Sequence, residues 1–152
     1  MTEELLRSLA EDPAPILNSG YRAKERIAAR KERITQWRHI AESITANPEN
    51  ASGGGGYPAS KVENCVAAIS VLEHEIMSEI EELTAIERQT AQIIHDLVAD
   101  PNCKMVLELR YLCYLRYEEI AVRMNYTFRW TQELHRRAVL SVQNAASALL
   151  PE

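Results

Sequence analysis

The sequence predicts an all-α protein, in which a long, coiled-coil-like antiparallel helical hairpin is followed by a C-terminal helix-turn-helix domain. Three observations lead to this prediction. Apolar residues recur at helical spacing along most of the 152 residues, the glycines gather mainly in one short run, and aromatic residues make up only 6% of the chain. With 46% hydrophobic residues, the chain has enough apolar material for a core.

The N-terminal segment, residues 1–20, is expected to form a short helix and a linker. Its apolar positions are Leu5, Leu6 and Leu9, and two prolines follow them. The chain has no apolar run of the length that a membrane helix needs, and its acidic start does not have the pattern of a secretory signal. Three cysteines without C-x-x-C spacing indicate reduced thiols. We therefore expect a cytoplasmic protein that does not bind membranes.

Residues 21–100 are predicted to form the hairpin. The first helix, residues 21–46, has apolar residues at steps of seven and three, which is typical of a coiled-coil seam. That seam contains Ile27, Ile34, Trp37, Ala41 and Ile44. The second helix, residues 61–99, is expected to start at a capping box of Ser60 and Glu63. Its predicted seam contains Val62, Val66, Ile69, Leu72, Ile76, Ile80, Leu83, Ile86, Ile93 and Leu97.

The segment between the two helices, residues 47–60, contains four consecutive glycines. Glycine is unfavourable inside a helix, and the Asn-Pro pair at 47–48 ends the first helix. A phosphate-binding loop is the alternative, but the Lys-Ser/Thr ending and the preceding strand of a P-loop are missing. We therefore predict a hairpin connector.

The net charge of −5 conceals large differences between regions. Residues 21–46 carry 7 basic and 3 acidic side chains, whereas residues 61–100 carry 2 basic and 9 acidic ones. These opposite charges favour pairing of the two helices, although each exposed ion pair adds only ~0–1 kcal/mol. Residues 101–152 carry 7 basic and 5 acidic side chains, so the negative total does not exclude a nucleic-acid partner.

The second hairpin helix is predicted to be longer than the first, which leaves its far end without a partner. The apolar residues that need a cover there are Ile86, Ile93, Ile94 and Leu97. The cover could come from the N-terminal leucines, from the C-terminal domain or from a second chain. On this unpaired seam we predict a homodimer formed through the hairpin.

Residues 101–152 contain the pattern of a helix-turn-helix domain. Residues 101–115 are expected to form a helix with one face made of Met105, Val106, Leu109, Leu112 and Cys113. Residues 117–124 form the next helix, Asn125 supplies the left-handed turn residue, and Thr127 caps a helix that extends to Ala146. The predicted inner lining is Ile120, Ala121, Met124, Tyr126, Leu134 and Ala138. Thr131 stands where valine or isoleucine is usual, and its methyl group is expected to face inward.

The outer face of this last helix holds the candidate DNA-binding residues. They are Thr127, Arg129, Trp130, Gln132, Glu133, Arg136 and Arg137. Arginine and glutamine hydrogen-bond to guanine and adenine edges in the major groove. Arg129 and Gln132 lie on the first turns, where base edges are reached, whereas Arg136 and Arg137 are expected to contact phosphates.

Two of these residues have open alternatives. Trp130 could contact a thymine methyl group or a sugar, or it could pack against its own domain or a partner chain. Glu133 could accept a hydrogen bond from a cytosine amine, but we favour an ion pair with Arg129 or Arg137 one turn away. The start of the helix at Thr127 should lie near a phosphate.

From Met105 to Leu140 the chain resembles the C-terminal helix-turn-helix of sigma-70-type factors, through LELRYL and YEEIA. From about residue 21 its layout also resembles small phage and prophage regulators of Gram-positive bacteria. These are the sigma-70 region-4-like proteins related to the RinA and ArpU late-gene regulators, with a loop like SGGGGYPASKVENCV and a motif like YEEIAVRMNYT. The chain departs from that family at Asn125, where glycine is usual, and at Thr131.

The resemblance implies binding of double-stranded promoter DNA and control of phage genes. We expect the acidic hairpin to serve assembly or contact with bacterial RNA polymerase. Two other classes stay open. The small subunit of a phage terminase, which would form large rings, also joins a helix-turn-helix to helical oligomerisation segments. A purely helical interaction protein would show no affinity for DNA even at low salt.

Enzyme signals are poor. The four histidines, at positions 39, 74, 95 and 135, do not form a ligand pair at the spacing of a helical metal site. The carboxylates of residues 73–87 are expected on a solvated helix face, and no cysteine stands with a histidine as a nucleophile would. We therefore expect no catalytic residues, no metal and no cofactor.

Overall fold

The computed structural model describes residues 1–46 and 58–151, and in these residues every regular element is an α-helix. The helices are α1 (Glu3–Glu11), α2 (Ala14–Leu17), α3 (Ser19–Ala46), α4 (Pro58–Leu97), α5 (Pro101–Tyr111), α6 (Tyr117–Met124) and α7 (Phe128–Leu149). The prediction of an all-α protein is confirmed. Most of the predicted connector falls on residues 47–57, outside the described residues.

The chain divides into two compact units. We call Ala23–Leu83 the hairpin unit, and we call Met1–Arg22 together with Thr84–Glu152 the core unit. The long helix α4 therefore contributes to both units, whereas the sequence division places its whole length in the hairpin. None of the helices in the described residues is both long and apolar enough to span a bilayer.

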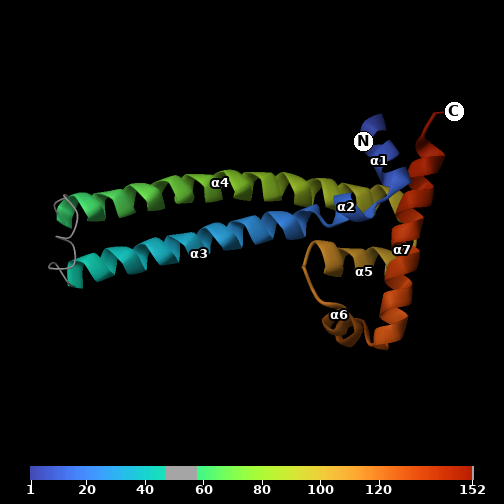
Figure 1. The fold of residues 1–152 in the computed structure, drawn as a ribbon. Helices are drawn as coiled ribbons and strands as arrows, with labels where there is room; N and C mark the ends of the chain where they lie inside the picture. Colours follow the sequence, from blue (N-terminus) through green and yellow to red (C-terminus); the bar gives the residue numbers. More distant parts are fainter. Residues whose placement is uncertain (47–57, 152) are drawn as a thin grey trace. The chain divides into compact units, whose positions relative to one another are not determined.

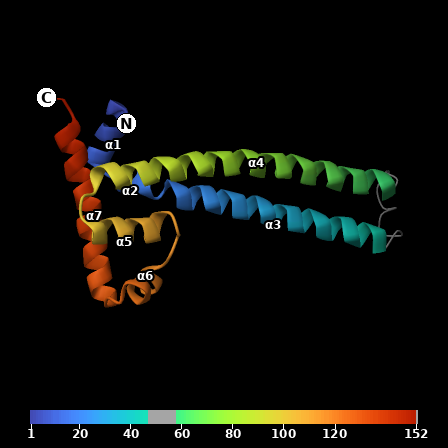
Figure 2. The same ribbon diagram turned by 180° about the vertical axis from the view of Figure 1, so that it is seen from behind.

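In the hairpin unit, α3 and α4 lie side by side and run in opposite directions (Figure 1, Figure 2). The predicted seam of α3 is confirmed, because Ile27 and Ile34 are buried and the other three predicted residues are half-buried. Ala23 and Arg30 complete the alternating steps of four and three along this face.

The predicted seam of α4 is correct only in part. Leu72 is buried, but Val66 and Ile80 are 60% and 43% exposed. Cys65 and Glu79 take their places, because the steps of three and four that include Leu72 lead to these positions. The predicted capping box is also wrong. The helix starts two residues before Ser60, with Pro58 at a first position that tolerates proline well.

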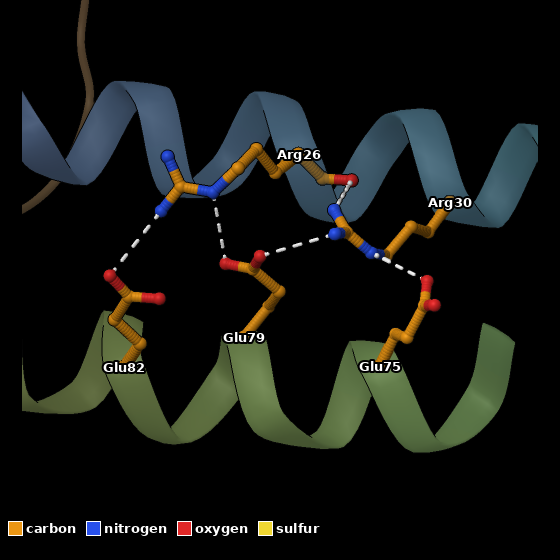
Figure 3. A network of polar contacts seen from close by, with 5 residues as sticks. All are labelled: Arg26, Arg30, Glu75, Glu79 and Glu82. Carbon is orange, nitrogen blue, oxygen red and sulfur yellow. Dashed lines mark hydrogen bonds and ion pairs between the residues drawn. The ribbon is translucent and has the colours of Figure 1, made fainter. Parts of the chain in front are cut away.

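A layer of charged side chains explains why an acid can occupy the seam (Figure 3). Arg26 Nε donates to Glu79 Oε2 at 3.0 Å, and Arg30 Nη2 lies 3.4 Å from Glu79 Oε1. Arg30 Nε also donates to Glu75 at 3.1 Å, and Arg26 approaches Glu82 at 3.6 Å. The Glu79 side chain is only 12% exposed. A buried charge without its partner is costly. This layer therefore disfavours any alignment of α3 against α4 that separates the arginines of α3 from the glutamates of α4.

The core unit packs α1, α5 and α6 against α7, with α6 towards the N-terminal end of α7 and α1 towards its C-terminal end (Figure 1). In its core, the C-terminal end of α4 packs in one cluster with the N-terminal helices and with α5, α6 and α7. The largest fully buried apolar side chains of this unit are Leu9, Leu17, Ile93, Ile94, Val98, Val106, Leu107, Ile120 and Val142. Gln143 Nε2 donates to the carbonyl oxygens of Ala10 and Glu11, both at 3.0 Å, which fastens α1 to α7.

This core accounts for the unpaired end of the long helix. Ile93, Ile94 and Leu97 belong to one cluster with the predicted N-terminal helix and with the C-terminal helices, whereas Ile86 is half-buried and lies outside this cluster. The N-terminal leucines and the C-terminal domain, two of the three expected covers, therefore supply it within one chain. The unpaired seam on which the homodimer was predicted is therefore largely covered within one chain. The homodimer itself stays an untested prediction.

Helix α5 differs from its predicted face. Val106 and Leu109 are buried and Leu112 is half-buried, as expected, but Met105 is 45% exposed and Cys113 is exposed. The buried residues that the sequence pattern missed are Cys103, Leu107 and Tyr111. The helix ends at Tyr111, so helical spacing no longer places Cys113, and neighbours enclose the helix from more than one side.

Candidate nucleic-acid interface

The turn between α6 and α7 depends on a residue in the left-handed conformation. Asn125 has φ 59° and ψ 44°, a region in which asparagine is tolerated better than most residues. Its N–H points at Val122 O, 3.3 Å away, and the N–H of Tyr126 donates to Ala121 O at 2.9 Å. The expected left-handed turn at Asn125 is confirmed.

Thr127 fixes the start of α7. Its Oγ1 accepts a hydrogen bond from the N–H of Trp130 at 3.1 Å, as a helix N-cap does. Thr131 is fully buried, and its Oγ1 donates to Thr127 O at 2.9 Å. The hydroxyl that replaces the usual valine methyl group therefore has a partner, which removes the cost of burying it.

The inner lining of the two helices is as predicted. Ile120 and Ala138 are fully buried, Ala121 and Leu134 are nearly so, and Met124 and Tyr126 are half-buried. Because these residues fix one side of α7 against α6 and the core, the opposite side of its first three turns faces outward. The helix extends to Leu149, three residues beyond the predicted end.

A polar aromatic cluster, which the sequence analysis missed, also holds the inner side of α7. His135 Nε2 lies 2.7 Å from the hydroxyl of Tyr111, and its Nδ1 lies 3.4 Å from the hydroxyl of Tyr117. Burial, with a smaller contribution from Arg110, lowers the pKa of His135 to about 4. The imidazole is therefore neutral near pH 7. Its position four residues after Thr131 was the signal that it faces inward.

Arg110 joins this cluster to the N-terminal segment. Its guanidinium lies over the rings of Tyr117 and Tyr21, 4.4 Å and 5.1 Å from their centroids. Its Nη1 donates to Leu115 O at 3.0 Å, and its own carbonyl accepts a hydrogen bond from the hydroxyl of Tyr21. The start of α3 thereby helps to position the α5–α6 connection.

The seven predicted site residues are brought together by α7. They line one open hollow of about 610 Å³ on its outer side, and we call this set of residues, from Thr127 to Arg137, the arginine face. Arg129 and Gln132 are exposed, and neither side chain has an ion pair or a hydrogen bond within the described part of the chain. Both are therefore available to a ligand.

Glu133 links the other arginines of this face. Its Oε1 accepts from Arg136 Nη2 at 2.7 Å and from Arg137 Nε at 3.1 Å, and its Oε2 accepts from Arg136 Nε at 3.1 Å. These bonds lower the pKa of the Glu133 carboxyl to about 2. The predicted pair with Arg137 is confirmed. The second partner of Glu133 is Arg136, which also follows it in the helix, rather than Arg129, which precedes it.

Trp130 is 38% exposed, and the guanidinium of Arg137 lies 5.0 Å from the centroid of its ring. The indole is thus neither buried in the core unit nor free of contacts. One edge of the arginine face is an aromatic surface with a cation held against it.

Comparison with protein-family models, with curated proteins and with solved structures gives no match to this chain. Within the described residues, no group of three or more histidine, cysteine, aspartate or glutamate side chains is placed to hold a metal ion.

Proposed function

We propose that this protein is a sequence-specific transcriptional regulator that binds double-stranded promoter DNA through α7. One observation carries the proposal: three arginines, a glutamine and a tryptophan share the outer side of the first turns of a long helix. The inner side of that helix is fixed by the core. A single α-helix fits the major groove, and arginine and glutamine are the side chains that recognise purine edges there.

The individual roles follow from position and from existing contacts. Arg129 and Gln132, which have no side-chain partners among the described residues, reach base edges. Trp130 contacts a thymine methyl group or a sugar beside them. Arg136 and Arg137, one to two turns further along the helix, contact phosphates and fix the register. The capped N-terminus at Thr127 directs backbone N–H groups at a further phosphate.

The wider setting rests on the resemblance of YEEIAVRMNYT and its flanking segments to phage and prophage regulators. We extend the proposal accordingly to a regulator of phage or prophage genes that acts in the cytoplasm. The three free thiols, at Cys65, Cys103 and Cys113, suit that compartment. The acidic side of the hairpin would then serve assembly or contact with RNA polymerase.

The test starts with the selection of duplexes that the protein binds from fragments of the neighbouring genome. Binding of a selected duplex is then compared between the wild type and Arg129→Ala/Gln132→Ala. Each lost bidentate contact should weaken specific binding by about 1–3 kcal/mol, whereas binding to random duplex should change little.

The matched control is Arg88→Ala/Gln89→Ala, which removes the same two side-chain types from the exposed surface of α4. It should bind like the wild type. Equal binding of the selected duplex by the wild type and by Arg129→Ala/Gln132→Ala would contradict base recognition by this helix. A chain without salt-dependent affinity for any duplex would contradict DNA binding altogether.

A further inference from the structure

Glu133 is the only acidic residue of the arginine face. Both of its oxygens are used, and the guanidinium of Arg136 grips it with two parallel bonds, Nε to Oε2 and Nη2 to Oε1. A phosphodiester also presents two anionic oxygens, which guanidinium groups bind in the same forked geometry. The carboxylate therefore occupies the donors that a DNA phosphate would need.

Stability does not explain this arrangement. The side chains of Arg136 and Arg137 are 66% and 56% exposed, and exposed ion pairs contribute little to folding. For the same reason the pairs are easily exchanged for another anion. The hydrogen bonds keep the carboxyl ionised at any physiological pH, so its negative charge stays on the face that would approach DNA.

The two arginines that Glu133 engages are those further from the start of α7, which we expect to contact phosphates. The two side chains that we expect to read bases, Arg129 and Gln132, are not engaged by it. The carboxylate thus acts on the contacts that carry no sequence information and leaves the sequence-reading contacts free.

Building on the proposed function, we propose that Glu133 is an internal competitor of the DNA backbone. In the free protein it holds Arg136 and Arg137 and weakens binding to duplexes of any sequence. On binding, phosphates replace the carboxylate as the partner of the two arginines, so part of the binding free energy is used to break these ion pairs.

Two other roles for Glu133 make the opposite prediction. If it positioned the arginines for phosphates, or if it accepted a hydrogen bond from cytosine, its loss would weaken binding. The sign of the change therefore separates competition from both alternatives.

The experiment measures binding of a random-sequence duplex to the full chain at several salt concentrations. It compares the wild type with Glu133→Gln and with Glu108→Gln, which makes the same charge change on the exposed surface of α5. Glu133→Gln should bind about eightfold more tightly at about 0.1 M monovalent salt. Its plot of the logarithm of the binding constant against the logarithm of salt concentration should be steeper by about 0.9. Glu108→Gln should match the wild type.

A selected duplex should gain affinity by a similar factor, because the contacts that Glu133 opposes carry no sequence information. If Glu133→Gln binds the random duplex no more tightly than the wild type does, the proposal that Glu133 competes with the DNA backbone is wrong. The proposed function survives that result if Arg129→Ala/Gln132→Ala still loses specific binding. If no variant binds DNA at low salt, both proposals fail together.

Discussion

The hairpin unit and the core unit are both made of packed helices, but their interiors differ in kind. Among the largest fully buried side chains of the described residues, all except Cys65 lie in the core unit. The hairpin seam instead contains Arg30 and Glu79, in a layer of ion pairs. The core unit is thus stabilised by apolar burial, whereas the hairpin gives up part of that stabilisation for a defined pairing of its helices.

The difference matters because the arginine face belongs to the core unit. The proposed DNA binding requires that this face is held rigidly, and the inner side of α7 is buried from Thr131 to Ala146. The hairpin can open locally at a lower cost, because few of its side chains are fully removed from water. The two tryptophans report on these units separately, since Trp37 lies on the hairpin seam and Trp130 on the arginine face.

The largest expected effect is that of a cavity in the core unit. Leu107→Ala removes a fully buried side chain and should lower the free energy of unfolding by about 2–5 kcal/mol. Denaturant unfolding is followed by Trp130 fluorescence in a Trp37→Phe background. The matched variant Leu72→Ala, on the hairpin seam, should leave the Trp130 transition in place. A shift of that transition as large as the one from Leu107→Ala would show that the units do not differ as described.

His135 should make the stability of the core unit depend on pH. The pKa of His135 is about 4 in the folded chain and about 6.5 in the unfolded one, so between these values the unfolded chain binds more protons. Stability from this group is therefore complete above pH 6.5 and is lost as the pH falls towards 4, by up to about 3 kcal/mol. His135→Gln should flatten the profile of the Trp130 transition over this range. A profile that keeps its slope in this variant would assign the titration to another group.

Removal of the acid from the hairpin seam should have a smaller effect. Glu79→Ala leaves Arg26 without its 3.0 Å partner and should lower hairpin stability by about 1–3 kcal/mol, followed by Trp37 fluorescence. Arg30→Leu/Glu79→Leu puts apolar side chains at both seam positions, and should unfold at a denaturant concentration no lower than that of the wild type. If the double variant is as unstable as Glu79→Ala, the ion pairs contribute stability rather than pairing specificity.

The smallest effect concerns the start of α3. A Cβ atom at Gly20 would lie 2.7 Å from the hydroxyl of Tyr114, which donates to Glu87 at 2.7 Å. Gly20→Ala should therefore cost about 1 kcal/mol, although alanine is the better helix former. In a Tyr114→Phe background the oxygen is gone, but the ring carbon Cε1 still lies 3.2 Å from the added Cβ atom, so the same change should cost less than in the wild type. Equal costs in both backgrounds would mean that the hydroxyl is not the obstacle.

The sequence predicts well those features that local chemistry determines. Asn125 and Thr127 were found because a left-handed turn and a helix cap each need particular residue types. The seam of α3 was found from its spacing. On α4 the prediction chose Val66 and Ile80 because they are apolar. Regular spacing from Leu72 leads instead to Cys65 and Glu79, which the seam uses.

Features that depend on distant parts of the chain were beyond local pattern. Tyr21 bonds to the carbonyl of Arg110, 89 residues away, and nothing in either neighbourhood indicates this contact. The cover of α4 by α1 is of the same kind. On the arginine face, the residues were predictable from helical spacing, but the choice of Arg136 over Arg129 as the partner of Glu133 depends on side-chain rotamers.

The most direct test of the central claim is a map of backbone amide shifts on titration with a selected duplex. If α7 enters the groove, the largest perturbations should lie between Thr127 and Arg137, with the inner positions Thr131 and Leu134 affected less. Perturbations confined to α3 and the hairpin part of α4, with the amides of the arginine face unchanged, would contradict the account.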